Sequence, residues 1–562
     1  MSNKFKLSII ILVLSLGLLS YAIYKQVGDP EVIKSFELYE ESAQQGDADA
    51  QYYLGRMYVE GRSVQQDDVK AFEWFEKSAQ QGHVFAQYNL GAMYDEGRGV
   101  QQDDVKAFEW YEKSAQQSDV DAQYNLGLMY AEGRGVAQDD VKAFEWFEKS
   151  AQQGDAEAQN YLGAMYAEGL GVAQDDVKAA EWYEKSAQQG DAEAQYNLGV
   201  MYARGRGVTQ DDVKALEWYK KSAQQGDADA QYNLGVMYVE GSGVTQDYVR
   251  AAEWFEQSAQ QGHVSAQYNL GVMSFEGRGV TQDDVKAFEW YKKSVQQGHV
   301  IAQNNLGSMY AEGRGVQQDF TTALEWYEKS AQQGNAEAQY NLGVMYARGR
   351  GVTQDDVKAA EWFEKSAQQG NVEAQKNLGI MYFEGLGVQQ DYRKAFGWYE
   401  QSAQQGDAEA QYHLGIMYFE GRGVQQDDVK AFEWYEQSAQ QGDAEAQYNL
   451  GMMYAEGRGV IQDDAKAFEW FEKSAQQGDA DAQNNLGRRY AEGIGVQQDY
   501  RKAFEWFKKS AQQGDAVAQY NLGMMYSVWE NVSLAKEYFK LACDNGVQKG
   551  CDRYQEHKEV HH

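Results

Sequence analysis

Proline is nearly absent from this 562-residue sequence, which contains only Pro30. The turns between its structural elements must therefore be formed by glycine and by Asp or Asn residues. Cysteine is almost as rare, with 2 residues in the whole chain. Basic residues are also few, because 51 lysines and arginines face 86 acidic residues and leave a formal charge of −35. A chain this acidic lacks the basic surface that nucleic acid requires, so nucleic acid is excluded as a partner.

Long apolar runs are missing as well, with one exception near the N-terminus. Residues 7–24 are uncharged and mostly apolar, and lysines precede them. Residues 1–24 therefore predict either a cleaved export signal or a single membrane anchor. In both cases the positive N-terminus stays inside the cell. We therefore expect an exported chain that is anchored on the periplasmic side of the inner membrane, soluble in the periplasm or secreted. This segment is the only part that we expect to contact the membrane.

Repetition is what the sequence has in abundance. A pattern of 36 residues, clearest in residues 120–155 (VDAQYNLGLMYAEGRGVAQDDVKAFEWFEKSAQQGD), recurs without insertion or deletion from residue 48 until the last copy, whose loop loses four residues. We identify fourteen copies within residues 48–551, the last of which serves as a C-terminal cap. Residues 25–47 hold a linker and a half-repeat that we interpret as an N-terminal cap, and residues 552–562 form a charged tail. The copies start at residues 48, 84, 120, 156, 192, 228, 264, 300, 336, 372, 408, 444, 480 and 516.

The first half of each copy predicts a helix. Asp119 is placed to cap it, and Gly133 to end it in a left-handed conformation. The face expected to be buried follows helical spacing and carries Ala122, Leu126, Met129 and Tyr130. Gly127 lies inside this helix in every copy, although a mid-helix glycine costs about 1 kcal/mol relative to alanine. Its recurrence predicts that an aromatic side chain of the second helix lies over it.

The second half of each copy predicts another helix, so that one copy is a helical hairpin. Asp139 is the expected cap, with Asp140 in the first turn, and Gly154 closes the hairpin. We expect its buried face to consist of Ala143, Trp146, Phe147, Ser150 and Ala151. One hairpin cannot bury two aromatic faces, so neighbouring copies must stack.

No pattern in the sequence predicts a catalytic, metal or cofactor site. The Asp-Asp pairs are interpreted as helix caps, because they lack the spacing of calcium ligands or of an acid/base pair. The GRGV loops have no following GK[ST] and no preceding strand, so they do not predict a phosphate loop. His263 and His299 take N-cap positions in adjacent copies. Stacked equivalents lie roughly 10 Å apart, which is too far for one zinc ion.

The repeat resembles the Sel1-like repeat family, relatives of tetratricopeptide repeats. The motif consists of A-x-A-Q-Y-N-L-G-x-M-Y, G-x-G-V-x-x-D-x-x-K-A and E-W-Y-x-K-S-A-x-x-G, carried here by residues 122–130, 133–143 and 145–154. The resemblance implies an all-α fold, an α/α solenoid with a right-handed superhelix. It further implies a non-catalytic scaffold or adaptor of the bacterial cell envelope that binds protein segments on its concave face. A cell-envelope enzyme or β-lactam-binding protein, and a secreted or surface host-contact factor, are the alternatives.

The cysteines depart from the cysteine-rich, β-lactam-linked members of that family, which carry a pair in each repeat. Only Cys543 and Cys551 remain here, at the spacing such pairs use. This departure weakens the β-lactam alternative. In an exported chain we expect one disulfide between them, against the alternative of two free buried thiols.

The resemblance also implies where a partner would bind, because the first helices of such solenoids line the concave surface. Candidate side chains are a Tyr-Asn pair beside the buried face and two positions that vary among copies. The alternative is structural: the asparagine bonds to a neighbouring helix and the tyrosine packs between repeats. The candidates are Tyr124, Asn125, Leu128, Ala131, Tyr196, Asn197, Tyr232, Asn233, Tyr268, Asn269, Tyr340, Asn341, Tyr448 and Asn449.

Overall fold

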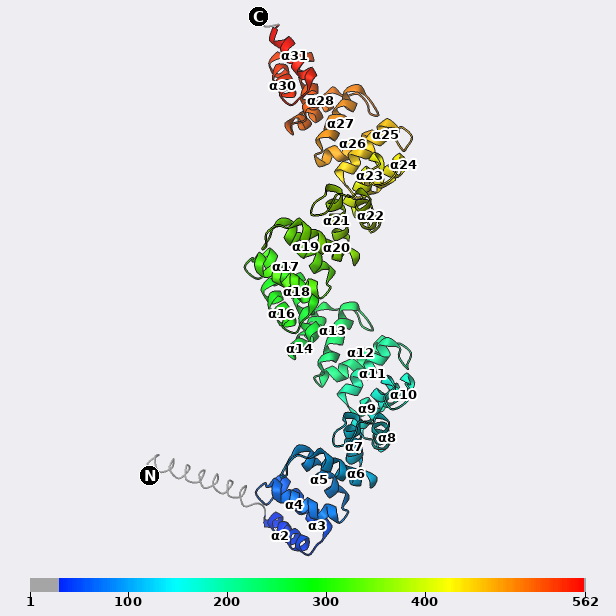
Figure 1. The fold of residues 1–562 in the computed structure, drawn as a ribbon, viewed down its shortest axis with the longest axis vertical. Coiled ribbons are helices and arrows are strands. Elements are labelled where there is room, and N and C mark those ends of the chain that lie inside the picture. Colours follow the sequence, from blue (N-terminus) through cyan, green and yellow to red (C-terminus); the bar gives the residue numbers. More distant parts are fainter. Residues whose placement is uncertain (1–29, 560–562) are drawn as a thin grey trace, which may run out of the picture. The chain divides into compact units, whose positions relative to one another are not determined.

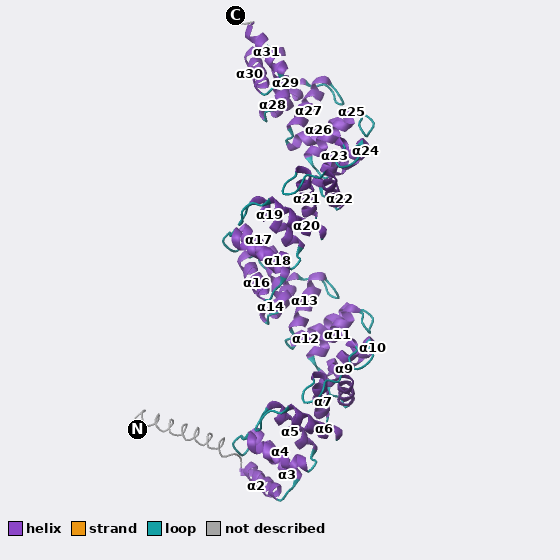
Figure 2. Ribbon diagram, viewed as in Figure 1, coloured by secondary structure: helices purple, strands orange, loops and turns teal. Residues whose placement is uncertain are grey.

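The computed structural model describes residues 30–559, and every regular element in that range is an α-helix (Figures 1 and 2). Two helices joined by a short loop correspond to each 36-residue copy. Among the described helices, none is both long enough and apolar enough to cross a membrane. The predicted signal or anchor at residues 7–24 lies outside the described residues.

The chain divides into two compact units, residues 1–282 and residues 283–562. The helices of the first unit are α2 (Pro30–Gln44), α3 (Ala48–Glu60), α4 (Asp68–Gln80), α5 (Val84–Glu96), α6 (Asp104–Gln116), α7 (Val120–Glu132), α8 (Asp140–Gln152), α9 (Ala156–Glu168), α10 (Asp176–Gln189), α11 (Ala192–Arg204), α12 (Asp212–Gln224), α13 (Ala228–Glu240), α14 (Tyr248–Gln260) and α15 (Val264–Glu276). Those of the second are α16 (Asp284–Gln296), α17 (Val300–Glu312), α18 (Phe320–Gln332), α19 (Ala336–Arg348), α20 (Asp356–Gln368), α21 (Val372–Glu384), α22 (Tyr392–Gln404), α23 (Ala408–Glu420), α24 (Asp428–Gln440), α25 (Ala444–Glu456), α26 (Asp464–Gln477), α27 (Ala480–Glu492), α28 (Tyr500–Gln512), α29 (Ala516–Val528), α30 (Val532–Asp544) and α31 (Gln548–Glu559).

The predicted start and stop signals of the helices are confirmed. The Asp119 carboxylate starts α7 by accepting a hydrogen bond from a backbone N–H of the first turn at 2.8 Å. Asp139 starts α8 in the same way, at 3.1 Å. Gly133 ends α7 with φ 70°, and Gly154 lies after α8 with φ 101°. Glycine adopts this left-handed conformation without steric penalty, which explains why a chain almost free of proline can turn so often.

The close approach predicted at the mid-helix glycine is also confirmed. A methyl group built on Gly127 would lie 2.7 Å from Cδ1 of Phe147, closer than two carbon atoms can approach. Leu126 and Phe147 beside it are fully buried. The same contact recurs at the equivalent glycines from Gly55 to Gly235 and from Gly307 to Gly523, where a Tyr or Phe of the second helix covers the glycine. These hairpins are therefore held by a ring packed directly against a helix backbone.

Trp146 corrects one prediction, because it is half-buried and not part of the fully buried face. The neighbouring Phe147 takes the core position, and successive helical residues point about 100° apart. The outer side of the indole is covered by the Lys149 ammonium, 3.6 Å from a ring centroid. The recurrent W-x-x-K spacing thus forms a cation–π contact on the surface of the second helix.

A glutamine joins neighbouring hairpins. The Gln123 amide on α7 donates to the carbonyl oxygen of Ala115 on α6 at 3.1 Å. Its Oε1 accepts from Nε2 of Gln153 at 2.8 Å. Within the hairpin, the buried Ser150 hydroxyl donates to the carbonyl oxygen of Val120 at 3.1 Å. The same three hydrogen bonds occur in other copies, such as those that start at residues 48 and 444, where they join the two helices of a hairpin and connect it to the preceding hairpin.

The C-terminal end differs from the prediction. Residues 552–559, which we expected to belong to a charged tail, continue the helix α31. A disulfide between Cys543 and Cys551 joins α31 to α30. His557 stacks on Phe539 with 5.4 Å between ring centroids. The aromatic face of α30 needs a cover at the end of the array, and α31 supplies it.

Candidate functional site

Grooves lie between the first helices of several successive copies, and counterparts of the residues predicted from the sequence line them. One groove, of 290 Å³, lies between α13 and α15. Tyr232, Val236 and Val239 of α13 line it from one side, and Asn269 and Val272 of α15 line it from the other. Tyr232 corresponds to Tyr124, Val239 to Ala131 and Asn269 to Asn125. Val236 and Val272 both correspond to Leu128, each in its own copy. The structure thus brings the candidate positions of two neighbouring copies together in one groove.

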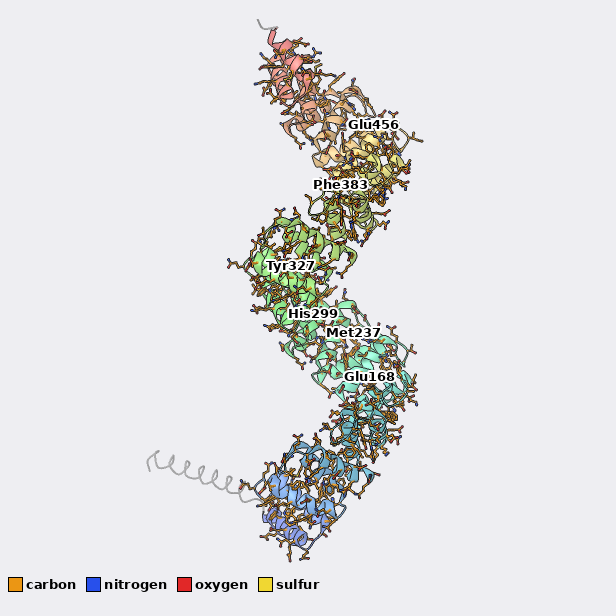
Figure 3. The ribbon with its side chains drawn as sticks, viewed as in Figure 1. Glu168, Met237, His299, Tyr327, Phe383 and Glu456 are labelled. Atoms are coloured by element: carbon orange, nitrogen blue, oxygen red, sulfur yellow. A yellow bond between two sulfur atoms is a disulfide. The ribbon has the colours of Figure 1, made fainter. Side chains whose placement is uncertain are left out.

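Two further grooves are built in the same way. The groove between α11 and α13 has a volume of 370 Å³ and contains Tyr196 and Asn233. The groove between α23 and α25 in the second unit has a volume of 430 Å³ and contains Tyr448 and Asn449. Figure 3 labels Met237 on α13 and Glu456 at the end of α25, which belong to these two grooves.

The groove tyrosines pack on the aromatic ring that covers the mid-helix glycine. Tyr124 lies 5.9 Å from Phe147, ring centroid to ring centroid, and is half-buried. Burial raises the pKa of the Tyr124 phenol, so its hydroxyl stays neutral. The same pairing occurs for Tyr196, Tyr232, Tyr340 and Tyr448, at 5.7 to 5.9 Å. Tyr268 is half-buried on α15.

The groove asparagines bond within the array. The Asn125 amide donates to the carbonyl oxygen of Asp121 in its own helix at 3.0 Å. Asn197 donates to Asn160 of the preceding copy at 3.3 Å, and Asn341 donates to Asn304 at 3.0 Å. The bonds of Asn197 and Asn341 match the structural alternative for the asparagines, whereas Asn125 bonds within its own helix and the tyrosines pack on a ring of their own copy. The aliphatic positions equivalent to Leu128 and Ala131 remain as the half-buried floor that a partner could touch.

The rim of the grooves carries charged residues that the sequence analysis did not single out. The last residue of the first helix is a glutamate in most copies, such as Glu240 and Glu276, and an arginine in Arg204 and Arg348. In the groove between α13 and α15, Arg278 pairs with Glu276 at 2.9 Å. The variation of charge at a fixed position of the repeat was the signal that could have indicated this rim.

Loop arginines also connect neighbouring copies. Arg206 bonds to Asp176, the second residue of an Asp pair in the preceding copy, at 2.8 Å. Arg98, Arg314 and Arg458 make the same contact with Asp68, Asp284 and Asp428, at 2.9 to 3.1 Å. Where the copy has Phe320 in place of this aspartate, the Arg350 guanidinium lies over the ring at 5.6 Å. The Asp pairs therefore contribute an ion pair between copies in addition to the predicted helix cap.

The two histidines considered as metal ligands are helix caps. Nδ1 of His263 accepts the backbone N–H of Ala266 at 3.1 Å, and Nδ1 of His299 accepts that of Ala302 at 3.1 Å. Within residues 30–559, no group of three or more His, Cys, Asp or Glu side chains could hold a metal ion.

The first helices α21 and α23 each depart from the repeat pattern at one candidate position. Lys376 replaces the tyrosine of α21, and His413 replaces the asparagine of α23. Lys376 lies 2.7 Å from Glu373 and 3.2 Å from Glu409. Burial lowers the pKa of Lys376, but its hydrogen bond to Glu373 and the neighbouring carboxylates outweigh this and raise it.

His413 occupies the space that the missing tyrosine leaves. It stacks on the buried ring of Tyr399 with 4.8 Å between centroids. Burial lowers the pKa of His413, although the nearby Glu409 and Glu445 act in the opposite direction. Nδ1 of His413 and the hydroxyl of Tyr399 are buried without a hydrogen-bond partner among the described residues.

Paired helices, stacked without strands and joined by recurrent polar contacts, define the class of α/α solenoid proteins. The model of the Sel1 repeat matches fifteen consecutive segments that cover residues 18–547. The chain belongs to the Sel1 repeat family. Solenoids of this kind are in general non-catalytic scaffolds that bind other proteins.

Solved structures of repeat proteins are similar to this chain. The c5321 protein of uropathogenic Escherichia coli, described as a protective antigen with an SLR fold, is 36% identical. That likeness covers 85% of this chain and 95% of the other, with a TM-score of 0.69. A Sel1 repeat protein from Oxalobacter formigenes is 38% identical over 55% of this chain and 90% of its own, with a TM-score of 0.45. No curated protein sequence matches the chain.

Proposed function

We propose that this protein is a scaffold that binds segments of other proteins in the grooves between successive first helices. The observation that carries the proposal is the groove between α13 and α15. It combines an aliphatic floor of Val236 and Val272 with aromatic walls. An equivalent groove recurs five repeats later, between α23 and α25. A binding surface made of repeated units suits an extended partner that engages more than one groove.

Groove size and lining support this use. Volumes of 290 to 430 Å³ match the lower end of small binding pockets, about 300–1,000 Å³, and hold one or two side chains of a partner. Burial of an aliphatic side chain contributes about 1.5–3 kcal/mol. One groove alone therefore gives weak binding. Occupation of two grooves by one partner raises the affinity, because the second contact becomes intramolecular.

We further propose that the scaffold acts outside the cytoplasmic membrane. The apolar run at residues 7–24 motivates this location. The similar c5321 protein is described as a protective antigen, and contact with a host is one reason for such a protein to lie outside the cytoplasm. The test is protease accessibility of the array in intact cells and spheroplasts, together with mass spectrometry of the mature N-terminus. Protection in spheroplasts would contradict the proposal.

A second candidate is a surface or secreted host-contact factor, which the same antigen description favours. It differs from an envelope scaffold in its partner, which would be a host protein. Detection of the chain in the culture medium or on the outer surface by antibody labelling distinguishes the two.

The binding proposal is tested by a photo-crosslinking residue placed at Val236 in the groove. The matched control carries the same residue at Val213 on α12, where the side chain is 54% exposed and lies outside the groove. We expect discrete adducts from position 236 that position 213 does not give. The identified partner, once purified, should lose affinity for Val236→Arg. The array itself has Arg56 and Arg488 at this position, so the variant should fold. Identical adducts at both positions, or unchanged affinity, would overturn the proposal.

A further inference from the structure

The two equivalent grooves share a rim of like charge. In the groove between α13 and α15, Glu240 and Glu276 end the two helices. In the groove between α23 and α25, Glu420 and Glu456 take the same places. The groove between α11 and α13 differs, because Arg204 stands opposite Glu240 there and Gln210 and Ser242 make it more polar.

One glutamate in each of the two grooves is left available for a partner. Glu276 is held by Arg278 at 2.9 Å, and Glu420 by Arg422 at 2.7 Å. Glu240 has no cationic partner among the described residues and accepts only from the Ser242 hydroxyl, at 3.3 Å. Glu456 is likewise without an ion pair in the described part of the chain, and both side chains are exposed.

The arginine at the second groove does not cancel this charge. The Arg458 guanidinium lies 2.9 Å from Asp428. It also lies over the Phe419 ring at 3.8 Å. Its charge is therefore directed at a neighbour in the array, and the carboxylate of Glu456 remains unpaired beside an apolar floor of Ile416 and Met452.

From this arrangement we infer that the grooves recognise a segment that places a lysine or arginine next to an aliphatic side chain. The inference rests on the proposed function and names the chemistry of its partner. The aliphatic side chain enters between the first helices, and the basic group meets the unpaired glutamate at the rim. A rim charge in water contributes mainly to association rate and selectivity. The excess of 86 acidic over 51 basic residues attracts such a segment over a longer range.

The repeat supplies the variants for a test. Because Arg204 and Arg348 stand at the position of Glu240, a change of Glu240→Arg together with Glu456→Arg uses a residue that the array accepts. The control is Glu253→Arg with Glu433→Arg. Both control residues are exposed on second helices, and the pair changes the net charge by the same amount. Long-range attraction is therefore equal in the two proteins, and only the groove differs.

In the experiment, a phage-displayed library of random linear peptides is selected on the purified full chain. The affinity of each enriched peptide is then measured for the unchanged chain, the groove variant and the control variant. We expect enriched sequences with a lysine or arginine beside Leu, Ile, Val or Met. We expect their affinity to fall about five- to tenfold more in the groove variant than in the control, and less so at high salt. Equal affinity for the two variants would overturn the inference, as would enrichment of peptides without basic residues.

A third protein separates this inference from the function on which it rests. In Val236→Arg with Met452→Arg, the floor of both grooves is blocked. If the enriched peptides lack basic residues but lose affinity for this third protein, the grooves bind segments without the proposed charge recognition. Peptides that bind this protein as well as the unchanged chain show that the grooves are not the binding site, and both proposals then fail.

Discussion

The absence of a side chain at Gly127 allows α7 and α8 to approach until a phenyl ring touches the helix backbone. The chain also offers the opposite case, Gly397 on α22, where nothing lies within 4 Å of an added methyl group. The two glycines share a helical backbone and differ only in their surroundings. They therefore separate the packing effect of a missing methyl group from its effect on helix propensity.

We expect Gly127→Ala to destabilise the protein and Gly397→Ala to stabilise it. The first forces the fully buried Phe147 to move, which costs about 1–3 kcal/mol and outweighs the gain in helix propensity. The second gains up to about 1 kcal/mol, because alanine is the better helix former. Urea unfolding followed by circular dichroism measures both, with hydrogen exchange to localise the change. A stabilised Gly127→Ala would contradict the account of the close approach.

His413 gives a prediction for the dependence of stability on pH. Burial lowers its pKa in the folded protein, so the unfolded chain binds this proton more readily. The contribution of neutral His413 to stability is present above about pH 6.5, the value of an unperturbed histidine, and is lost as the pH falls below it. We expect His413→Asn, which restores the residue of other copies, to lose less stability between pH 7.5 and pH 5. Equal losses in urea unfolding would show that protonation of His413 does not strain the fold.

At the scale of elements, hairpins are joined by hydrogen bonds that a hydrophobic pattern does not reveal. Gln123 uses its amide on the preceding hairpin and its carbonyl on its own second helix. The Gln123 side chain is 4% exposed, so it cannot bond to water in place of these partners. Gln152, in contrast, is exposed on the neighbouring helix α8.

We expect Gln123→Ala to destabilise the array by about 1–3 kcal/mol, because it removes two hydrogen bonds, one to the Ala115 carbonyl and one from the Gln153 amide. Gln152→Ala, the same change at an exposed site, should alter the stability by less than about 0.5 kcal/mol. Amide exchange at the end of α6 should increase in the first variant only. A small effect of both substitutions would mean that stacking of the hairpins depends on apolar contacts alone.

For the whole molecule, stability in a repeat array is approximately the sum of unit and nearest-neighbour contributions. Removal of residues 120–155 leaves each remaining hairpin with an equivalent neighbour, whereas removal of residues 120–137 leaves a second helix without its partner. We expect the first deletion to give a folded, shorter helical protein and the second to lose cooperative unfolding locally. Circular dichroism and urea unfolding compare the two, and an equal loss of cooperativity would refute the repeat model.

The sequence by itself determined the secondary structure and its period. Helix caps such as Asp119, left-handed glycines such as Gly133 and the spacing of buried residues are local properties of the chain, and they recur from copy to copy. The groove position of Tyr232 and Val236, the counterparts of Tyr124 and Leu128, was also predictable, because residues beside a buried helical stripe must lie next to the neighbouring hairpin.

Only the tertiary structure decided which of these residues are already engaged. The pairing of Asn197 with Asn160, the ion pair of Arg206 with Asp176 and the helical course of α31 depend on contacts between copies. Such contacts are set by how hairpins stack, and one copy read alone does not contain them. The same reason explains Trp146, since its spacing fits the buried face while the neighbouring Phe147 fills the core. The stacking leaves the aliphatic floor of the grooves uncovered and Glu240 and Glu456 of the rim without an ion pair, because these positions face the space between first helices.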